Sequence, residues 1–184
     1  MKTKNLVIGG AALLAAAGVG AAMLYNQKKT IPKGAKAVKP FDSKLYLGKW
    51  YEIARMDFIH EKNLTNATAE YSLNGDGTIK VVNKGYNYKK GQEQKSEGKA
   101  KFVADKNEAK LKVSFFGPFY AGYNVIAIDP SYNNALVVGK NKSYMWLLSR
   151  DKQMPEEIRK SYLQKAEDLG FNTKKLVWTD HSKC

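Results

Sequence analysis

The chain has 184 residues, which is enough for one domain with a substantial core and hardly enough for two. Its formal net charge is +14, and the first 40 residues carry half of this excess, because they hold seven lysines and no acidic residue. The lysines are scattered, and no recognition helix, zinc-binding or RNA-binding pattern accompanies them, which argues against a nucleic-acid partner. A lysine-rich surface that is attracted to anionic lipid headgroups is the better interpretation.

Residues 1–25 are predicted to be an export signal or a membrane anchor. Two lysines precede an uncharged, Gly- and Ala-rich run of 19 residues at 6–24, about the length that crosses a hydrocarbon core as a helix. The length favours an anchor, whereas the small residues at 15–17 and 20–22 favour cleavage, and both interpretations stay open. A bacterial lipoprotein signal needs a cysteine directly after the apolar run. The only cysteine is Cys184, which excludes lipid modification there and also any intramolecular disulfide.

Residues 26–40 are predicted to be a basic linker. Pro32, Gly34 and Pro40 disfavour a helix or strand in this segment. Its five lysines would, by the positive-inside rule, keep the rest of the chain in the cytoplasm. A short basic start followed by an apolar run is instead typical of exported proteins, and we expect the rest of the chain to face the periplasm.

Residues 41–184 are predicted to form a single all-β domain. Short alternating runs are separated by turn-forming residues, for example at 74–77, 105–108 and 129–133. The expected strands are 49–57, 66–73, 78–86, 92–104, 108–116, 122–129, 134–138 and 143–150. Eight strands joined by hairpins favour an antiparallel up-and-down meander, and eight is the number that closes into a small barrel able to hold one ligand.

A helix and a short final strand are expected after the eighth strand. In the segment PEEIRKSYLQKAEDLG the residues Ile158, Tyr162, Ala166 and Leu169 fall on one stripe. Acidic residues lie in the first turn, and Gly170 is placed as a C-terminal cap. The run KLVW at 175–178 predicts the last strand.

Three short motifs occur in an order and spacing that resemble those of a known barrel family. They are Gly48-x-Trp50 with the following YEIAR, YNVIAID at 123–129, and WLLSR at 146–150. Together they resemble the signature regions of the lipocalins, over essentially all of residues 41–184. Three further runs are similar to the bacterial outer-membrane lipocalins of the apolipoprotein D group: VNKGYN at 82–87, SEGKA at 96–100 and KVSFFGPFY at 112–120.

This resemblance implies an eight-stranded lipocalin barrel whose cavity takes a lipid, either a fatty acid or a lysophospholipid. It also implies that Trp50 plugs the closed end of the barrel, that Arg150 lies across its indole, and that Gly48 lets the chain bend as it enters the barrel. These three residues are therefore expected to be architectural. Bacterial members of the group usually carry a lipoprotein cysteine, and its absence here weakens the case for an outer-membrane address.

Alternation along the expected strands predicts which side chains face the barrel interior, because successive residues point to opposite faces. Lys112 and Ser114, for example, alternate with apolar neighbours and are assigned to the outside. The predicted ligand-binding residues are Glu52, Ala69, Tyr71, Val81, Asn83, Leu111, Val113, Phe115, Tyr144, Trp146 and Leu148. The alternative is that such side chains fill a solid barrel, but the small residues among those assigned inward favour a cavity.

Glu52 is unusual among these residues because it is acidic. Alternation puts Trp50, Glu52 and Ala54 on the inner face of the first strand and Arg55 on its outer face. A carboxyl group in an apolar interior needs a polar partner or must stay protonated, and Asn83 is the partner that we expect. The alternative is a β-bulge that turns Glu52 to solvent.

No constellation for catalysis or metal binding is evident. His60 and His181 are the only histidines, and neither a nucleophile motif nor a cluster of metal ligands occurs, so we predict no enzyme and no cofactor.

We expect a membrane-associated lipocalin of the cell envelope that binds or carries fatty acids or lysophospholipids, as a monomer or homodimer. It would meet the membrane through its N-terminal segment and basic surface. The alternatives are a structural envelope protein with an empty barrel, and an enzyme that acts on a bound lipid or isoprenoid.

Overall fold

The computed structural model describes residues 30–58 and 61–182 of the chain. The predicted hydrophobic helix within residues 1–25, the first residues of the predicted linker, His60 and Cys184 lie outside the described residues. Within the described ranges, no helix has the length and apolar character that crossing a membrane requires.

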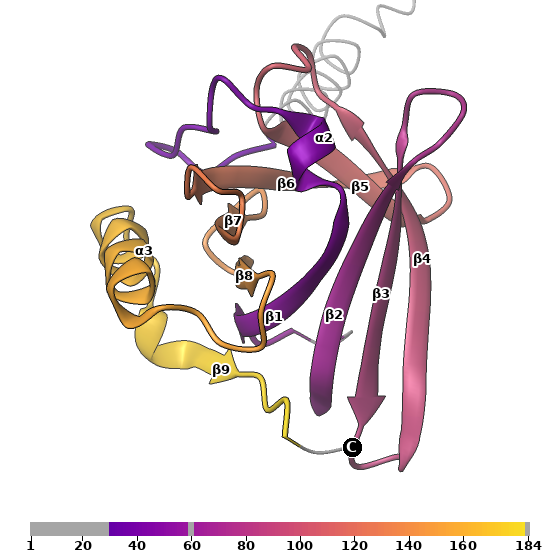
Figure 1. Ribbon diagram of the computed structural model, residues 1–184, viewed down its shortest axis with the longest axis vertical. Helices are drawn as coiled ribbons and strands as arrows, with labels where there is room; N and C mark the ends of the chain where they lie inside the picture. The colour runs from indigo at the N-terminus through magenta and orange to yellow at the C-terminus, as the bar shows by residue number, and fades with distance from the viewer. Residues whose placement is uncertain (1–29, 59–60, 183–184) are drawn as a thin grey trace, which may run out of the picture.

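In the part of the chain that the structure describes, nine antiparallel strands form one sheet that closes into a barrel (Figure 1). Their order is β2-β3-β4-β5-β6-β7-β8-β1-β9, and an additional pairing of β1 with β2 closes the ring. The strands are β1 (Gly48–Met56), β2 (Leu64–Leu73), β3 (Ile79–Asn87), β4 (Gln92–Phe102), β5 (Lys110–Phe116), β6 (Phe119–Ile128), β7 (Asn134–Val138), β8 (Met145–Ser149) and β9 (Leu176–Trp178). The predicted eight-stranded antiparallel barrel is confirmed, and β9 is the predicted short final strand, which extends the sheet beside β1.

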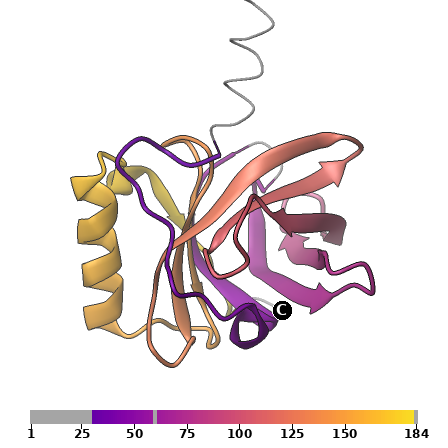
Figure 2. The same ribbon diagram turned by 90° about the horizontal axis from the view of Figure 1, so that it is seen from above.

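Between residues 30 and 182, the described helical segments are α2 (Ser43–Tyr46), α3 (Glu156–Asp168) and the 3-10 turn η1 (Thr173–Lys175). α2 precedes β1, and α3 stands against the outside of the barrel (Figure 2). α3 buries Tyr162 and Ala166 of the predicted apolar stripe. After its end, Gly170 has a φ of +80°, and the N–H of Phe171 donates to the carbonyl oxygen of Ala166 at 3.0 Å. This hydrogen bond satisfies a carbonyl of the last turn, so the predicted cap at Gly170 is confirmed.

Two apolar cores lie on the two sides of the barrel wall. The inner core fills the closed end of the barrel and includes Trp50 and Leu111. The outer core lies between the wall and α3 and includes Leu147 and Tyr162. β7 contributes to both cores, so all five of its residues are buried. A strand with one solvent-exposed face would instead alternate between polar and apolar residues.

Trp50 and Arg150 close one end of the barrel. The Trp50 side chain is fully buried, and its indole N–H donates to the carbonyl oxygen of Tyr46 at 2.8 Å. The Arg150 guanidinium lies 3.9 Å from the centre of the Trp50 ring and donates to main-chain oxygens of Leu45, Leu47 and Lys49. The architectural roles implied for this pair are confirmed, and the predicted bend at residue 48 coincides with a φ of +92°.

Residues 30–41 form neither helix nor strand, and they run along the barrel from the outer core, where Ile31 and Ala35 pack, to the inner core, where Phe41 is buried. The N–H of Val38 donates to the carbonyl oxygen of Val125 at 2.9 Å, and the carbonyl oxygen of Val38 accepts from the N–H of Ala109 at 2.9 Å. Ile31 packs against the outer core, and Thr30 is buried. The described part of the predicted linker is therefore attached to the barrel instead of spanning free solvent.

Candidate ligand-binding cavity

The interior of the barrel holds a cavity of about 770 Å³. This volume lies within the range of roughly 300–1,000 Å³ that small-molecule sites occupy. The wall is made by side chains of β1 to β6, β8 and α2, most of them apolar or aromatic. The alternative prediction of a barrel filled by its own side chains is therefore wrong.

All eleven residues that alternation assigned to a ligand line this cavity. They are Glu52, Ala69, Tyr71, Val81, Asn83, Leu111, Val113, Phe115, Tyr144, Trp146 and Leu148. Their contact with a bound lipid stays a prediction. Among them, Tyr144 and Trp146 stack with their ring centres 6.4 Å apart, and Phe58 meets both rings edge-on, which makes a broad aromatic surface on one wall.

Three tyrosine hydroxyl groups meet at the floor of the cavity, at the closed end. Tyr46 comes from α2, Tyr71 from β2 and Tyr123 from β6. The Tyr123 oxygen lies 2.6 Å from the Tyr46 oxygen and 2.7 Å from the Tyr71 oxygen. Burial raises the pKa of each phenol well above its ordinary value, so all three stay neutral in the physiological range.

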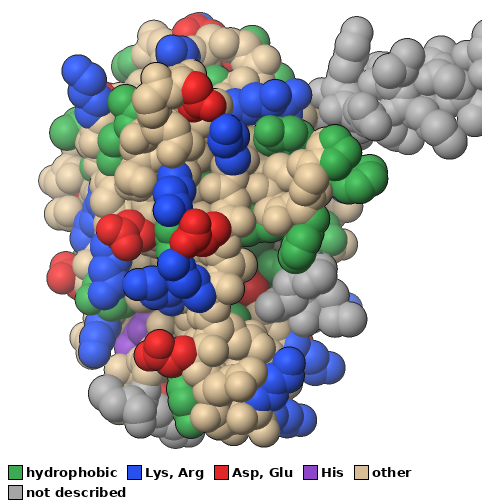
Figure 3. All heavy atoms as spheres, turned by 90° about the vertical axis from the view of Figure 1, so that its right-hand side faces the viewer, with side chains coloured by type: hydrophobic (Ala, Val, Ile, Leu, Met, Phe, Trp, Pro, Cys, Tyr) green, Lys and Arg blue, Asp and Glu red, His purple; other side chains and the backbone are tan. Residues whose placement is uncertain are grey.

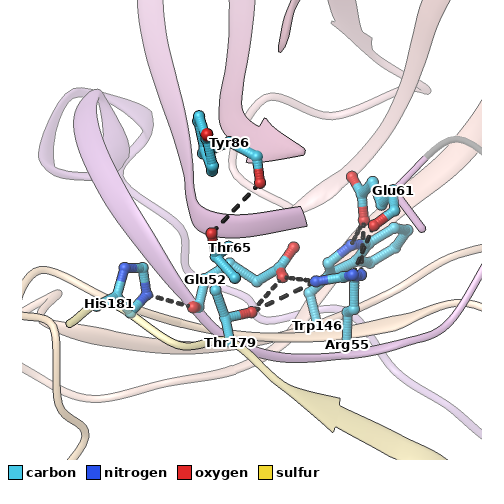
Figure 4. A network of polar contacts seen from close by, with 8 residues as sticks. All are labelled: Glu52, Arg55, Glu61, Thr65, Tyr86, Trp146, Thr179 and His181. Carbon is cyan, nitrogen blue, oxygen red and sulfur yellow. Dashed lines mark hydrogen bonds and ion pairs between the residues drawn. The ribbon is translucent and has the colours of Figure 1, made fainter. Parts of the chain in front are cut away.

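A polar network lies in the cavity wall (Figure 4), and its Arg55 is near the end of β1 that is away from Trp50, toward the open end of the barrel. Arg55 Nη1 donates to Glu52 Oε1 at 2.6 Å, and Thr179 Oγ1 donates to the same carboxylate oxygen at 2.5 Å. Arg55 Nη2 donates to the main-chain oxygen of Glu61 at 2.5 Å, and Trp146 Nε1 donates to Glu61 Oε2 at 3.0 Å. The network ties β1 to β8, to the segment that follows β9, and to the connection between β1 and β2.

The expected surroundings of Glu52 are partly wrong. Glu52 does face the cavity, but its partners are Arg55 and Thr179 instead of Asn83. The register between β1 and β8 shifts between Glu52 and Ala54, which is a β-bulge. Because an extra residue reverses the alternation, Ala54 packs in the outer core and Arg55 turns inward. The bulge therefore does not turn Glu52 to solvent but supplies its cation.

Glu61 is the second carboxyl group of this network, and its side chain is 17% exposed. Its Oε2 atom lies 3.8 Å from Arg55 Nε. Burial, reinforced by the neighbouring Glu52 carboxylate, raises the pKa of Glu61 to about 8, although Trp146 and Arg55 act in the opposite direction. Glu61 is therefore mainly protonated at neutral pH, and the network holds one ion pair with a neutral carboxyl group beside it.

Sequence reasoning missed several side chains of the cavity wall: Phe41, Tyr46, Phe58, Glu61 and Tyr123. Alternation along 122–129 would have placed Tyr123 with Val125 on the inner face, so this residue could have been found. The other four lie before β1 or in the connection after it, where no strand period assigns a side chain to a face.

Within residues 30–58 and 61–182, no group of His, Cys, Asp and Glu side chains is arranged to hold a metal ion. His181, the described histidine, lies with its Nε2 atom 2.8 Å from the main-chain oxygen of Glu52 and meets Tyr51 edge-on. It therefore helps to hold the segment after β9 against β1. The absence of catalysis stays a prediction.

The family profile described as "Lipocalin-like domain" matches residues 41–181. The chain belongs to the lipocalin family. Two similar relatives carry the name outer membrane lipoprotein Blc. The Citrobacter freundii protein is 52% identical over 149 residues, which cover 81% of this chain and 84% of the relative. The Escherichia coli K12 protein is 48% identical over 166 residues, which cover 90% and 94%.

Solved structures show the same lipocalin fold. Insecticyanin from the tobacco hornworm superposes with a TM-score of 0.67 at 22% identity, over 83% of this chain and 87% of that chain. In this lipocalin, the cavity combines an apolar wall with two polar places, the tyrosine floor and the network around Arg55. Such a site can bury a long apolar chain and hydrogen-bond to polar groups near its two ends.

Proposed function

We propose that this lipocalin binds long-chain fatty acids or lysophospholipids in its barrel and stores or carries them at the cell envelope. The observation that supports this most is the apolar cavity of about 770 Å³, which is closed at one end by Trp50. Transfer of an acyl chain from water into such a cavity gains about 0.8 kcal/mol per methylene group. The eleven cavity residues named above would make the contacts, and Trp146 with its aromatic neighbours would supply the largest apolar surface.

The attachment of the N-terminal segment supports a position close to a membrane. The carbonyl oxygen of Thr30 accepts a hydrogen bond from Asn124 Nδ2 at 2.6 Å, and the same Nδ2 atom also contacts the oxygen of Gly139 at 3.4 Å. Gly139 precedes Lys140, which lines the cavity at the open end. The chain that leads to the predicted anchor or export signal therefore starts beside the open end, and an anchor there would keep this end near its lipid source.

The surface charge fits a weak, additional attraction to anionic headgroups. Figure 3 shows lysine and acidic side chains interspersed over the face that lies on the right in Figure 1. On β3 and β4, Lys80 and Lys95 both pair with Glu97, and Lys99 pairs with Asp76. The relatives named outer membrane lipoproteins support an envelope location, although this chain lacks a cysteine after its apolar run. We therefore place the membrane contact mainly in the N-terminal segment.

Replacement of Trp146 by alanine tests the proposal. Native mass spectrometry should find fatty acids or lysophospholipids on the purified wild-type protein. Trp146→Ala should weaken palmitate binding by about tenfold or more, because a large buried aromatic surface is lost, and should abolish most of the ligand-induced change in tryptophan fluorescence. Trp178→Ala is the matched control, since Trp178 is 48% exposed and does not line the cavity. Failure of both lipid classes to bind the wild-type protein would refute the proposal.

A further inference from the structure

The three tyrosine hydroxyl groups at the floor of the cavity have one donor more than they can use among themselves. A phenol has a single O–H proton. Tyr46, Tyr71 and Tyr123 make two mutual hydrogen bonds, at 2.6 and 2.7 Å, so two of their three protons are used. The described residues provide no third hydrogen bond to these oxygen atoms. One buried proton is left over, and such a donor is costly unless it finds an acceptor.

The surroundings of the three hydroxyl groups are apolar on the protein side. Phe41, Trp50 and Leu111 belong to the same core, and the Trp50 N–H is already bound to a main-chain oxygen. All three tyrosines line the cavity. The open side of the cluster is therefore the ligand space, and an acceptor for the spare proton has to come from there.

We propose that the tyrosine floor is a subsite for a neutral oxygen atom carried at the buried end of an acyl chain, either a hydroxyl or a keto group. This inference rests on the proposed binding of lipids and names the class that the cavity favours, hydroxylated or oxo fatty acids. A hydroxyl group fits best, because it can accept the spare phenol proton and donate its own proton to a phenol oxygen. The hydrogen bonds offset the desolvation that would otherwise penalise a polar group deep in an apolar cavity.

A carboxylate is a poorer occupant of this subsite. Arg150 is a cation that acts on Tyr46 and Tyr71, but its guanidinium lies across the Trp50 ring and donates to main-chain oxygens of Leu45, Leu47 and Lys49. An anion at the floor would thus be buried with one spare donor and no free counter-ion, which is strongly unfavourable. The charged end of a fatty acid should therefore stay toward the open end, and the oxygen at the floor should belong to the far end of the chain.

The depth of the cavity suits this orientation. Leu64 begins β2 at the open end, and Tyr71 lies seven residues further along the same strand. At about 3.3 Å per residue, this is roughly 23 Å along the strand, which is an upper limit to the depth because barrel strands are tilted from the barrel axis. A long acyl chain can therefore extend from the open end to the tyrosine floor.

The test compares palmitic acid, α-hydroxypalmitic acid and ω-hydroxypalmitic acid as ligands of the full-length protein. The ω-hydroxyl should reach the floor, whereas the α-hydroxyl stays beside the carboxylate. The variant Tyr46→Phe/Tyr71→Phe/Tyr123→Phe keeps the ring shapes and removes all three hydroxyl groups together, a change that is close to neutral for folding because no partner is left unpaired. We compare the ratio of the affinity for ω-hydroxypalmitic acid to the affinity for palmitic acid in the two proteins. This ratio should be about tenfold lower in the triple variant than in the wild-type protein. The relative affinity for α-hydroxypalmitic acid should not change.

Tyr162→Phe is the matched control, because its hydroxyl group is also buried and hydrogen-bonded, to the main-chain oxygen of Asn134, but lies outside the cavity. In this control, the affinities for the two hydroxy acids relative to palmitic acid should be the same as in the wild type. A series of ω-hydroxy acids of different length on the wild-type protein gives a second measurement that does not depend on the triple variant, and relative affinity should peak at one length. Equal ratios in the wild type and the triple variant, or a series without a peak, would overturn the subsite. Failure of palmitic acid itself to bind would instead refute the proposed lipid binding.

Discussion

Arg55 is the residue that joins the two carboxyl groups of the cavity wall. Its side chain is 1% exposed, it is ion-paired with Glu52 at 2.6 Å, and it donates to the main chain at Glu61. An isolated charge at this depth would be very costly, so the pair is stable only as a unit. The bulge after Glu52 is what brings the guanidinium to the inner face, where the connection between β1 and β2 covers it.

At the residue scale, we expect Glu52→Gln to lower the free energy of unfolding by about 3 kcal/mol at pH 7. Removal of one partner from a buried ion pair typically costs roughly 3–5 kcal/mol, and the lower end applies because Glu61 can ionise and replace the lost charge. Urea denaturation followed by circular dichroism measures the change. Lys80→Gln is the control, since it breaks the exposed pair with Glu97 and should cost less than about 1 kcal/mol. Equal, small effects of both substitutions would contradict the role of the buried pair.

The connection between β1 and β2 is the element whose attachment to the barrel should depend most on pH. Glu61 belongs to it and contacts Trp146 of β8 and Arg55 of β1, while Glu52 and Asp57 act on it from nearby. The folded protein keeps the proton on Glu61 up to about pH 8, whereas the unfolded chain releases it near the ordinary value of 4.5. The folded state therefore binds more protons than the unfolded state between these two values. The stability that this group contributes is complete below about pH 4.5, falls progressively as the pH rises, and is lost by about pH 8.

At the element scale, Glu61→Gln should flatten the pH dependence of stability between pH 4.5 and 8. Glutamine still offers an oxygen to the Trp146 N–H but cannot ionise, so a slope of at most about 1.4 kcal/mol per pH unit disappears. Urea denaturation of both proteins across this pH range measures the difference in their free energies of unfolding. The other titrating groups are present in both proteins, so their contributions cancel in this difference. Glu97→Gln is the matched control, because that carboxyl group is exposed and its pKa is lowered, not raised. An unchanged slope in Glu61→Gln would show that Glu61 is ionised throughout.

The regular elements could be predicted from the sequence, whereas the irregular ones could not. Alternation and turn residues placed all eight barrel strands within a few residues, and the same alternation found Trp146 and Tyr71 on the cavity wall. A bulge adds one residue without any sequence mark, so the inward turn of Arg55 was missed. The single turn of α2 is too short to show a helical period, so Tyr46 was missed as well.

At the scale of the whole molecule, the barrel and residues 30–41 behave as one packed unit. We expect a chain that begins at Thr30 and one that begins at Phe41 both to fold as soluble β-proteins, with the shorter chain less stable by roughly 2–3 kcal/mol. The loss combines the two main-chain hydrogen bonds of Val38 with the apolar contact of Ile31. Circular dichroism and urea denaturation measure both properties.

Two single substitutions in the longer chain separate these contributions. Ile31→Ala should lower the free energy of unfolding by part of the amount that is lost on truncation to Phe41. Lys33→Ala, at an exposed position, should leave the free energy of unfolding unchanged. An insoluble or mainly helical product from both truncated chains would contradict the folding of the barrel without residues 1–29.

The closure of the ring through β1 also has a consequence for the order in which the barrel assembles. Each strand from β1 to β7 pairs with the strand that follows it in the chain, and these pairings need only short loops. β1 alone also pairs with strands from the far end of the chain, Tyr51 opposite Ser149 in β8 and Ala54 opposite Trp178 in β9. Such distant pairings lose loop-closure entropy before they gain contact energy, so we expect them to limit the folding rate. We therefore expect the meander of hairpins to form early and the meeting of β1 with β8 and β9 to be the slow, committing event.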